Sequence, residues 1–197
     1  MFVVGIAHPI CLRSIIDSLM VSIQDFKGLI NKRFFNNFFP IPATSPLKRG
    51  MNVPDFQLPN VTNNSQVKLS DYFNQQPVIL AFTRIFSEKL YCPLCYPHII
   101  ELNGAYEQFR SAGVEVLLIT STDHQQSLQV VQDLGLTMPF LCDPDCRVFR
   151  SYGVGQALGA PLPAQFVLDL QGRIKYRHLF SFFSPNADAD KLLTAVG

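Results

Sequence analysis

The sequence predicts an α/β fold in which one central mixed sheet carries helices on both faces. Apolar runs that are typical of buried strands alternate with amphipathic stretches of helical spacing, and glycine or aspartate stands at many of the boundaries. A chain of 197 residues with 48% hydrophobic and 16% charged residues is long enough and apolar enough to bury a core of ordinary size. Strands that alternate with helices pack as a sheet covered by those helices.

The first predicted elements are a hairpin, two buried strands and the helix between them. A strand near residues 54–59 pairs with the segment 67–73, which runs on into a helical turn. Continuous apolar runs at 78–83 and 114–120 predict strands that are buried on both faces. Between these two strands, apolar side chains recur at helical spacing as far as Gly113, where the helix is expected to stop.

The second half of the chain repeats this pattern and closes with another hairpin. Asp123 is placed to cap a helix that ends at Gly135, and a short strand follows at 140–142. A turn then leads into a helix that extends to Tyr152. The last predicted elements are strands at 165–169 and 173–177, with Gly172 in their turn, and a helix over about 187–195.

Cys92 and Cys95 form the most informative motif, a Cys-x-x-Cys between a buried strand and a helix. This placement puts a sulfur at the helix N-terminus, where unpaired N–H groups and the positive end of the helix dipole stabilise a thiolate. The thiolate attacks disulfides and peroxides, and a second cysteine within reach resolves the product. We therefore expect Cys92, exposed and ionised, to be the nucleophile and Cys95 to be the resolving thiol.

The composition argues against several other classes of protein. Lys and Arg number 16 against 15 Asp and Glu, a formal net charge of +1, so no large field attracts nucleic acid or an anionic membrane. Five cysteines is an odd number, which argues against a disulfide scaffold and favours a reducing compartment. No segment has the pattern of a membrane-spanning helix or a secretory signal, so a soluble cytoplasmic protein is expected.

The chain is expected to divide near residue 48. Residues 1–48 are an N-terminal extension, with an amphipathic helix over about 9–32 and a Pro-rich linker, and residues 49–197 are the main domain. The helix packs on the domain or on a second subunit of a homodimer, anchors at a membrane surface, or is a weakly ordered tail. In the last case translation would begin downstream, and Met20 and Met51 are the alternative starts.

A series of short motifs runs from residue 51 to about residue 180. They are Pro-Asp-Phe-x-Leu, a strand, Cys-Pro-x-Cys, Gly-Val-Glu-Val-Leu-Leu-Ile-Thr, Asp-Pro-Asp, Tyr-Gly-Val and Pro-x-x-Phe-Val-Leu-Asp-x-x-Gly. This order resembles the alkyl hydroperoxide reductase / thiol-specific antioxidant family, the peroxiredoxin-like proteins. The resemblance implies a thioredoxin-like fold with a peroxiredoxin-type N-terminal hairpin. It also implies reduction of peroxides or disulfides, a thioredoxin-like electron donor, and no metal or organic cofactor.

Departures from the family pattern bear on the chemistry. The family carries Pro-x-x-x-Thr/Ser-x-x-Cys before its reactive cysteine, and this chain has Ile85 and Lys89 at the Pro and Thr positions. An arginine that the family places before a late strand is missing, and Pro163 instead matches the cis-proline of thioredoxins, which lies beside the redox sulfurs and helps to bind extended substrates. Arg84 is expected to supply a positive charge near Cys92. These departures favour thioredoxin-like dithiol exchange over fast peroxide reduction.

Other interpretations of the cysteines stay open at this point. Cys142 and Cys146 supply two more sulfurs, which together with Cys92 and Cys95 would suit a zinc site. A zinc-stabilised or redox-inactive thioredoxin-fold binding module is therefore the alternative function. Without zinc, Cys142 is expected to pack as a buried strand residue and Cys146 to act as an auxiliary resolving thiol. His98 either lowers a thiol pKa or lies on the helix surface.

Overall fold

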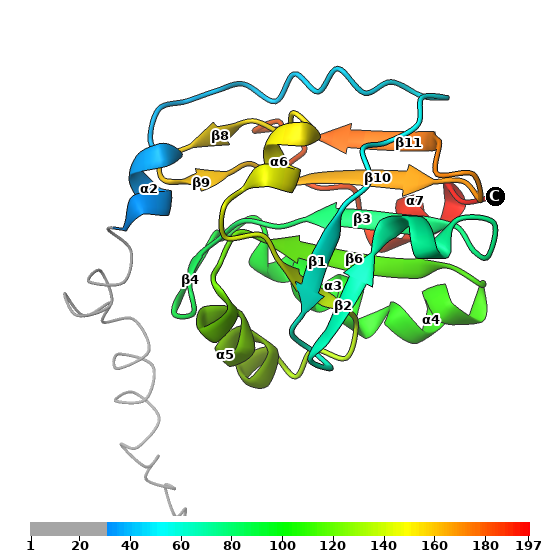
Figure 1. Cartoon of the computed structure of the whole chain (residues 1–197), viewed down its shortest axis with the longest axis horizontal. Coiled ribbons are helices and arrows are strands. Elements are labelled where there is room, and N and C mark those ends of the chain that lie inside the picture. The colour runs from blue at the N-terminus through cyan, green and yellow to red at the C-terminus, as the bar shows by residue number, and fades with distance from the viewer. Residues whose placement is uncertain (1–30) are drawn as a thin grey trace, which may run out of the picture.

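The computed structural model of the protein describes residues 31–197, and its centre is a seven-stranded mixed sheet (Figure 1). The strands are β1 (Gln57–Asn60), β2 (Ser65–Lys68), β3 (Val78–Phe82), β6 (Glu115–Thr120), β7 (Phe140–Cys142), β10 (Ala164–Leu168) and β11 (Ile174–Leu179). Their order across the sheet is β11-β10-β3-β6-β7-β1-β2. β3, β6 and β7 run parallel, whereas the other neighbouring pairs are antiparallel. The mixed sheet and its N-terminal hairpin, β1–β2, were both predicted from the sequence.

The strands in the middle of the sheet are the apolar runs that the sequence places there. Every residue of β3, β7 and β10 is buried, because protein layers cover both faces of the sheet. In β3, Leu80 pairs with Leu117 of β6 on one side and with Phe166 of β10 on the other. This register aligns the carboxyl end of β3, at Phe82, with the first residue of β10.

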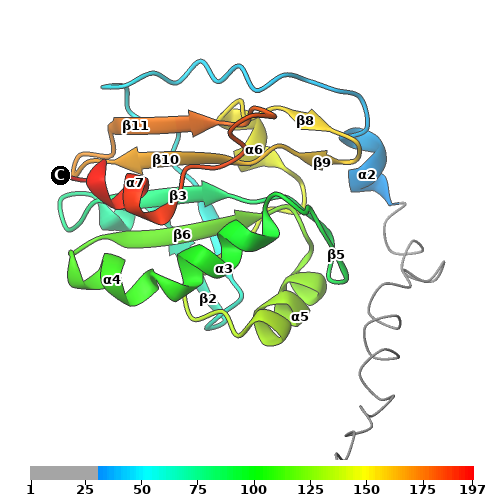
Figure 2. The same ribbon diagram turned by 180° about the vertical axis from the view of Figure 1, so that it is seen from behind.

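Helices α3 (Tyr96–Gly104), α4 (Tyr106–Ser111), α5 (His124–Leu134) and α7 (Ala189–Thr194) contribute to the core on one face of the sheet. Figure 2 shows α3, α4 and α7 lying across this face. The sequence predicts a single helix before Gly113, but the structure divides it at Ala105 into α3 and α4. α5 has the predicted ends: the Asp123 carboxylate accepts a hydrogen bond from the Gln126 amide at 2.8 Å, and Gly135 has a φ of 58°.

The opposite face is covered by α6 (Arg147–Ser151), the short 3-10 helix η2 (Leu69–Tyr72) and extended chain from the N-terminal side (Figure 1). Its centre is a group of aromatic rings around Phe82. The ring centroid of Phe82 lies 5.1 Å from those of Phe149 and Tyr152, and 5.9 Å from that of Phe166. Since Phe82 is the last residue of β3, this cluster anchors the strand end from which the candidate site begins.

Residues 31–52 lie along the domain (Figure 1). After α2 (Lys32–Asn36), the chain pairs with Gln156 through Ile41 and forms a bridge from Asn52 to Arg173. Leu47 is part of the core, and Arg177 donates hydrogen bonds to the Leu47 and Ser45 carbonyls. Most of the helix predicted over 9–32 falls outside the described residues, and so does Cys11. In the part of the chain that the structure describes, no helix is both long and apolar enough to cross a membrane.

Two small hairpins stand apart from the main sheet (Figures 1 and 2). One pairs β4 (Ile85–Ser87) with β5 (Leu90–Tyr91), and the other pairs β8 (Gln156–Ala157) with β9 (Ala160–Pro161). Neither small hairpin was predicted from the sequence, because strands of two or three residues are too short to leave a periodic pattern. The β4–β5 hairpin leads directly into Cys92.

We expect Phe82→Ala to lower the free energy of unfolding by about 3–5 kcal/mol, because it leaves a cavity within the aromatic cluster. Urea denaturation followed by circular dichroism measures this change. Leu128→Ala is the control, since Leu128 is 41% exposed on α5 and its truncation should cost less than about 1 kcal/mol. Equal losses in the two variants would contradict the anchoring role of Phe82.

Candidate active site

The Cys-x-x-Cys motif lies beyond the carboxyl end of β3, which is where open α/β sheets commonly bind ligands. From Phe82 the chain passes through Thr83 and Arg84, forms the β4–β5 hairpin, and returns to Cys92. The Cys92 amide donates to the Arg84 carbonyl at 3.4 Å, so the residues that precede and follow the hairpin lie side by side. A rigid strand therefore positions the segment that carries the first cysteine.

The two cysteines lie in a tight turn that precedes α3. The Cys92 carbonyl accepts hydrogen bonds from the amides of Cys95, at 2.9 Å, and Tyr96, at 3.0 Å. Cys95 is the N-cap residue of α3, so Cys92 stands just before the helix. Cys92 is 6% exposed and Cys95 is 1% exposed. The expectation of an exposed Cys92 is therefore wrong, because tertiary packing leaves little of the residue accessible to solvent.

The two sulfurs have opposite acid–base properties. The Cys95 thiol donates a hydrogen bond to the Cys92 sulfur, and this contact makes the largest contribution to a Cys92 pKa of about 6. The amides of Leu94 and Cys95 and the Arg84 charge also lower the Cys92 pKa, while burial opposes them. The same hydrogen bond, followed by burial and the Cys92 charge, raises the pKa of Cys95 far above its usual range. The pair therefore holds one thiolate and one thiol near neutral pH.

The amides that act on Cys92 come from the turn itself and not from the first turn of the helix. Sequence reasoning placed a sulfur at the helix N-terminus and attributed its acidity to the helix dipole. The structure shows that the Leu94 and Cys95 amides face the Cys92 sulfur before α3 begins at Tyr96. Hydrogen bonds from these turn amides, and not the helix dipole, therefore lower the pKa of Cys92.

Arg84 is the charged group that the structure places near the sulfur pair. It is 8% exposed, its guanidinium carbon lies 4.6 Å from the centroid of the Phe86 ring, and it donates to the Ala157 carbonyl in β8. Burial lowers the pKa of Arg84, whereas the negative charges of Cys92 and Cys95 raise it. Its Nε atom is buried and has no hydrogen-bond partner among residues 31–197. A positive charge therefore acts on both cysteines.

Pro163 lies at the same edge of the sheet but lacks the expected conformation. It is buried and directly precedes β10, whose first residue, Ala164, pairs with Phe82. The register places Pro163 across from Thr83, next to the segment that leads to the redox pair. The prediction of a cis peptide bond before Pro163 is wrong, because none of the described residues has a cis peptide bond.

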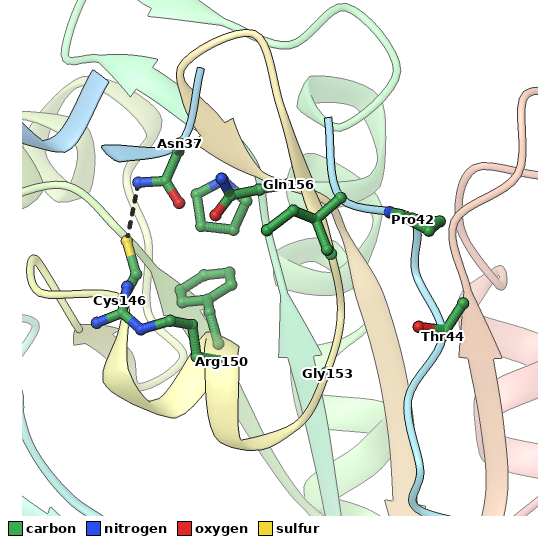
Figure 3. Close-up of a pocket in the computed structure, with 11 residues that line it drawn as sticks. Asn37, Pro42, Thr44, Cys146, Arg150, Gly153 and Gln156 are labelled. Carbon is green, nitrogen blue, oxygen red and sulfur yellow. Dashed lines mark hydrogen bonds between the residues drawn. The ribbon is translucent and has the colours of Figure 1, made fainter. Parts of the chain in front are cut away.

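Cys146 lies at a separate cavity of about 130 Å³ between the N-terminal segment and α6 (Figure 3). Its sulfur accepts a hydrogen bond from the side-chain Nδ2 of Asn37 at 3.6 Å, and Arg150 and Gln156 line the same cavity. Burial is the main cause that raises the pKa of Cys146 to about 11, so its thiolate is disfavoured at neutral pH. Cys142 is the last residue of β7 and is buried, as predicted.

A zinc site built from the two cysteine pairs is not supported. Within residues 31–197, no group of three or more His, Cys, Asp or Glu side chains is arranged to hold a metal ion. The four described cysteines are free thiols in the structure. His98 also differs from both interpretations: it is buried, it contacts the Ala187 carbonyl through Nε2 at 2.9 Å, and burial lowers its pKa.

Sequence reasoning missed a hydrogen-bonded chain that holds the cysteine turn. Gln165, fully buried in β10, donates to the Asn186 side-chain oxygen at 2.9 Å and accepts from the Ala187 amide at 2.9 Å. The Asn186 side-chain nitrogen then donates to the Leu94 carbonyl at 2.9 Å. That carbonyl shares a planar peptide with the Cys95 amide, so the chain also orients an amide that faces the Cys92 sulfur. No sequence spacing relates these residues, so only the fold reveals the chain.

The family of the protein is decided by comparison with known sequences. Residues 50–177, well over half of the chain, match the AhpC/TSA family. The chain belongs to this family. It is a thiol-dependent oxidoreductase of the peroxiredoxin-like class, and its thioredoxin-like fold agrees with that assignment.

Individual relatives fall into two groups by name. The thiol-disulfide oxidoreductase ResA of Geobacillus thermodenitrificans is 28% identical over 142 residues, which cover 72% of this chain and 74% of that protein. The peroxiredoxin Bcp of Escherichia coli is 26% identical over 156 residues, 76% of this chain and 95% of that protein. Among solved structures, peroxidoxin BcpB from Mycobacterium tuberculosis has a TM-score of 0.64 at 23% identity and covers 76% of this chain and 96% of its own.

In this AhpC/TSA protein, we expect the alkylation rate of Cys92 to rise with pH around a midpoint near 6, because its pKa is lowered to about 6. Cys95 should stay unmodified across the range from pH 5 to about 8, since its pKa is raised. Mass spectrometry after timed treatment of the reduced protein with iodoacetamide measures both rates. A midpoint near the ordinary thiol pKa of about 8.5 would contradict the arrangement.

We expect Asn186→Ala to raise the pKa of Cys92 by roughly half a unit to one unit, because one hydrogen bond is worth about 1 kcal/mol. The same alkylation profile measures this change. Asn186→Asp keeps the size of the side chain but lacks the donor to the Leu94 carbonyl, so it should act in the same direction. Gln125→Ala, on the exposed side of α5, is the control. An unchanged alkylation profile in both Asn186 variants would show that the hydrogen bonds from Gln165 through Asn186 do not orient the cysteine turn.

Proposed function

We propose that this protein performs thiol–disulfide exchange through a Cys92–Cys95 dithiol cycle. The hydrogen bond from the Cys95 thiol to the Cys92 sulfur carries the proposal, because it separates a nucleophile from a resolving thiol. Arg84 stabilises the thiolate, and Pro163 borders the same edge of the sheet as a substrate-positioning residue. The relative named as a thiol-disulfide oxidoreductase supports this reaction class.

In the proposed cycle, the Cys92 thiolate attacks one sulfur of a substrate disulfide. A mixed disulfide forms, and the other substrate sulfur leaves as a thiolate. Cys95 then loses its proton and attacks the Cys92 sulfur, which releases the second substrate thiolate and forms a Cys92–Cys95 disulfide. The substrate has gained two electrons from the dithiol. A thioredoxin-like donor, itself a dithiol, returns two electrons and restores both cysteines.

Peroxide reduction is the second candidate, and the burial of Cys92 favours it. With only 6% of the residue exposed, a small oxidant reaches the sulfur more easily than a folded protein does. The Cys92 thiolate would attack one peroxide oxygen, break the O–O bond and become a sulfenic acid, while the other oxygen leaves as alcohol or water. Cys95 would then condense with the sulfenic acid, releasing water and forming the same disulfide. The relative named peroxiredoxin Bcp supports this candidate.

The remaining features of the proposal concern organisation and partners. We assign residues 1–48 to an N-terminal extension and residues 49–197 to the thioredoxin-like domain. We further propose a cytoplasmic location, no nucleic-acid partner and a homodimeric assembly. Cys146 stays a candidate auxiliary thiol, although its raised pKa and the separate cavity place it at a disadvantage as a nucleophile.

We expect Cys92→Ser to abolish turnover and Cys95→Ser to accumulate a covalent adduct on Cys92, because the second variant keeps the nucleophile and loses the resolving thiol. Turnover is measured separately with a protein disulfide and with hydrogen peroxide. Mass spectrometry identifies the adduct as a mixed disulfide in the first case and as oxidised Cys92 in the second.

Cys142→Ser is the matched control, because Cys142 is buried in β7. This substitution should leave both turnover rates close to those of the natural chain. Equal residual activity in Cys92→Ser and Cys95→Ser would contradict the assigned roles. A natural chain that turns over neither substrate and whose Cys92 resists alkylation would instead support a redox-inactive binding module.

A further inference from the structure

Arg33, from the N-terminal segment, contacts the hairpin that carries the redox pair. Its Nη1 donates to the Ile85 carbonyl at 3.4 Å and to the Ser121 hydroxyl at 3.1 Å, and its Nη2 donates to the Phe86 carbonyl. Ile85 and Phe86 belong to β4, whereas Ser121 directly follows β6. The planar guanidinium therefore joins the small hairpin to the end of a central strand, a geometry that suits the fixed fork of arginine.

The β4–β5 hairpin needs external support. It is not part of the main sheet, and its two strands pair only at Ile85–Tyr91 and Ser87–Leu90, with an irregularity between these pairs. A hairpin of two short strands is marginally stable by itself in water. Its position therefore depends on the groups that hold it, among which Arg33 binds two successive backbone carbonyls.

The hairpin connects Arg33 to the sulfur pair. Phe86 binds Arg33 through its backbone carbonyl, and the centroid of its ring lies 4.6 Å from the Arg84 guanidinium carbon. β5 ends at Tyr91, and Cys92 follows directly. A displacement of β4 would therefore move both the cation that acts on Cys92 and the chain that carries Cys92 itself.

α2 has a fixed place against the domain, which allows Arg33 to act as a support. The Phe34 ring packs on Gly159 at the tip of the β8–β9 hairpin, so closely that a Cβ atom on Gly159 would lie 2.0 Å from the ring. On the next turn, Asn37 donates to the Cys146 sulfur at 3.6 Å. The Asn31 side chain caps the helix by accepting from the Phe34 amide at 3.0 Å. α2 is thereby held on both sides of Arg33.

We propose that Arg33 is a positioning residue for the Cys92–Cys95 pair, which it serves by holding the β4–β5 hairpin where Arg84 faces Cys92. The inference rests on the proposed dithiol function and extends the redox site to the N-terminal segment. Arg33 does not act on Cys92 directly. The charged and titratable groups that act on the Cys92 sulfur are Cys95 and Arg84. Burial lowers the pKa of Arg33, and the charges of Cys146 and Asp123 partly offset this effect.

The test compares Arg33→Ala, Arg33→Lys and Lys32→Ala in the full chain. Lys32→Ala is the matched control, because it removes a positive charge from an exposed residue of the same helix. For each protein, the rate of Cys92 alkylation by iodoacetamide is measured from pH 5 to pH 9, with circular dichroism to establish folding. Thermal stability is recorded in parallel, so that a loss of stability is distinguished from a shift of the pH profile.

We expect Arg33→Ala to move the midpoint of the profile upward by about one pH unit, which makes alkylation at pH 6 about fivefold slower. Arg33→Lys keeps the charge but lacks the planar fork, so its midpoint should also rise, by a smaller amount. The rate of Cys92 alkylation in Lys32→Ala should stay within about twofold of the rate in the natural chain at every pH.

Two results would overturn the inference. One is a folded Arg33→Ala and a folded Arg33→Lys that both keep the natural midpoint, with or without a loss of thermal stability. The other is global unfolding of both variants, since Arg33 would then stabilise the whole domain and not position the pair. A natural chain whose Cys92 does not react below pH 8 would refute the proposed function first, and is therefore distinguishable from a failure of Arg33 alone.

Discussion

The hydrogen bond from the Cys95 thiol to the Cys92 sulfur is the interaction on which the proposed chemistry depends. If the two thiols had the same pKa, each would ionise to the same extent, and neither sulfur would be the preferred nucleophile. Here one direction of donation is favoured, because the turn amides and Arg84 stabilise negative charge on Cys92, while Cys95 is almost completely buried. Burial raises the pKa of both thiols, and only at Cys92 do the hydrogen bonds and the Arg84 charge outweigh it.

The rest of the domain serves to keep this turn in place. The aromatic cluster around Phe82 fixes the end of β3, and the chain from Gln165 through Asn186 holds the Leu94 carbonyl from the neighbouring strand. Arg33 supports the hairpin from the N-terminal side. These three supports come from segments far apart in the sequence and meet at one edge of the sheet.

A nearly buried nucleophile has consequences for substrate choice. A sulfur with 6% exposure limits the size of the group that reaches it, which favours a small oxidant. The absence of the family's Pro and Thr from positions 85 and 89 favours disulfide exchange instead. These two observations point in different directions, one toward a small oxidant and the other toward a disulfide.

The α/β class, the main strands, the ends of α5 and the cysteine motif could all be predicted from the sequence, because buried strands, helix caps and Cys-x-x-Cys are local patterns. The burial of Cys92, the trans bond before Pro163 and the position of Cys146 at a separate cavity became visible only in the folded chain. Folding also brought Asn186 to the cysteine turn and Arg33 to the hairpin. Exposure and long-range hydrogen bonds depend on which surfaces meet, and no short stretch of residues contains that information.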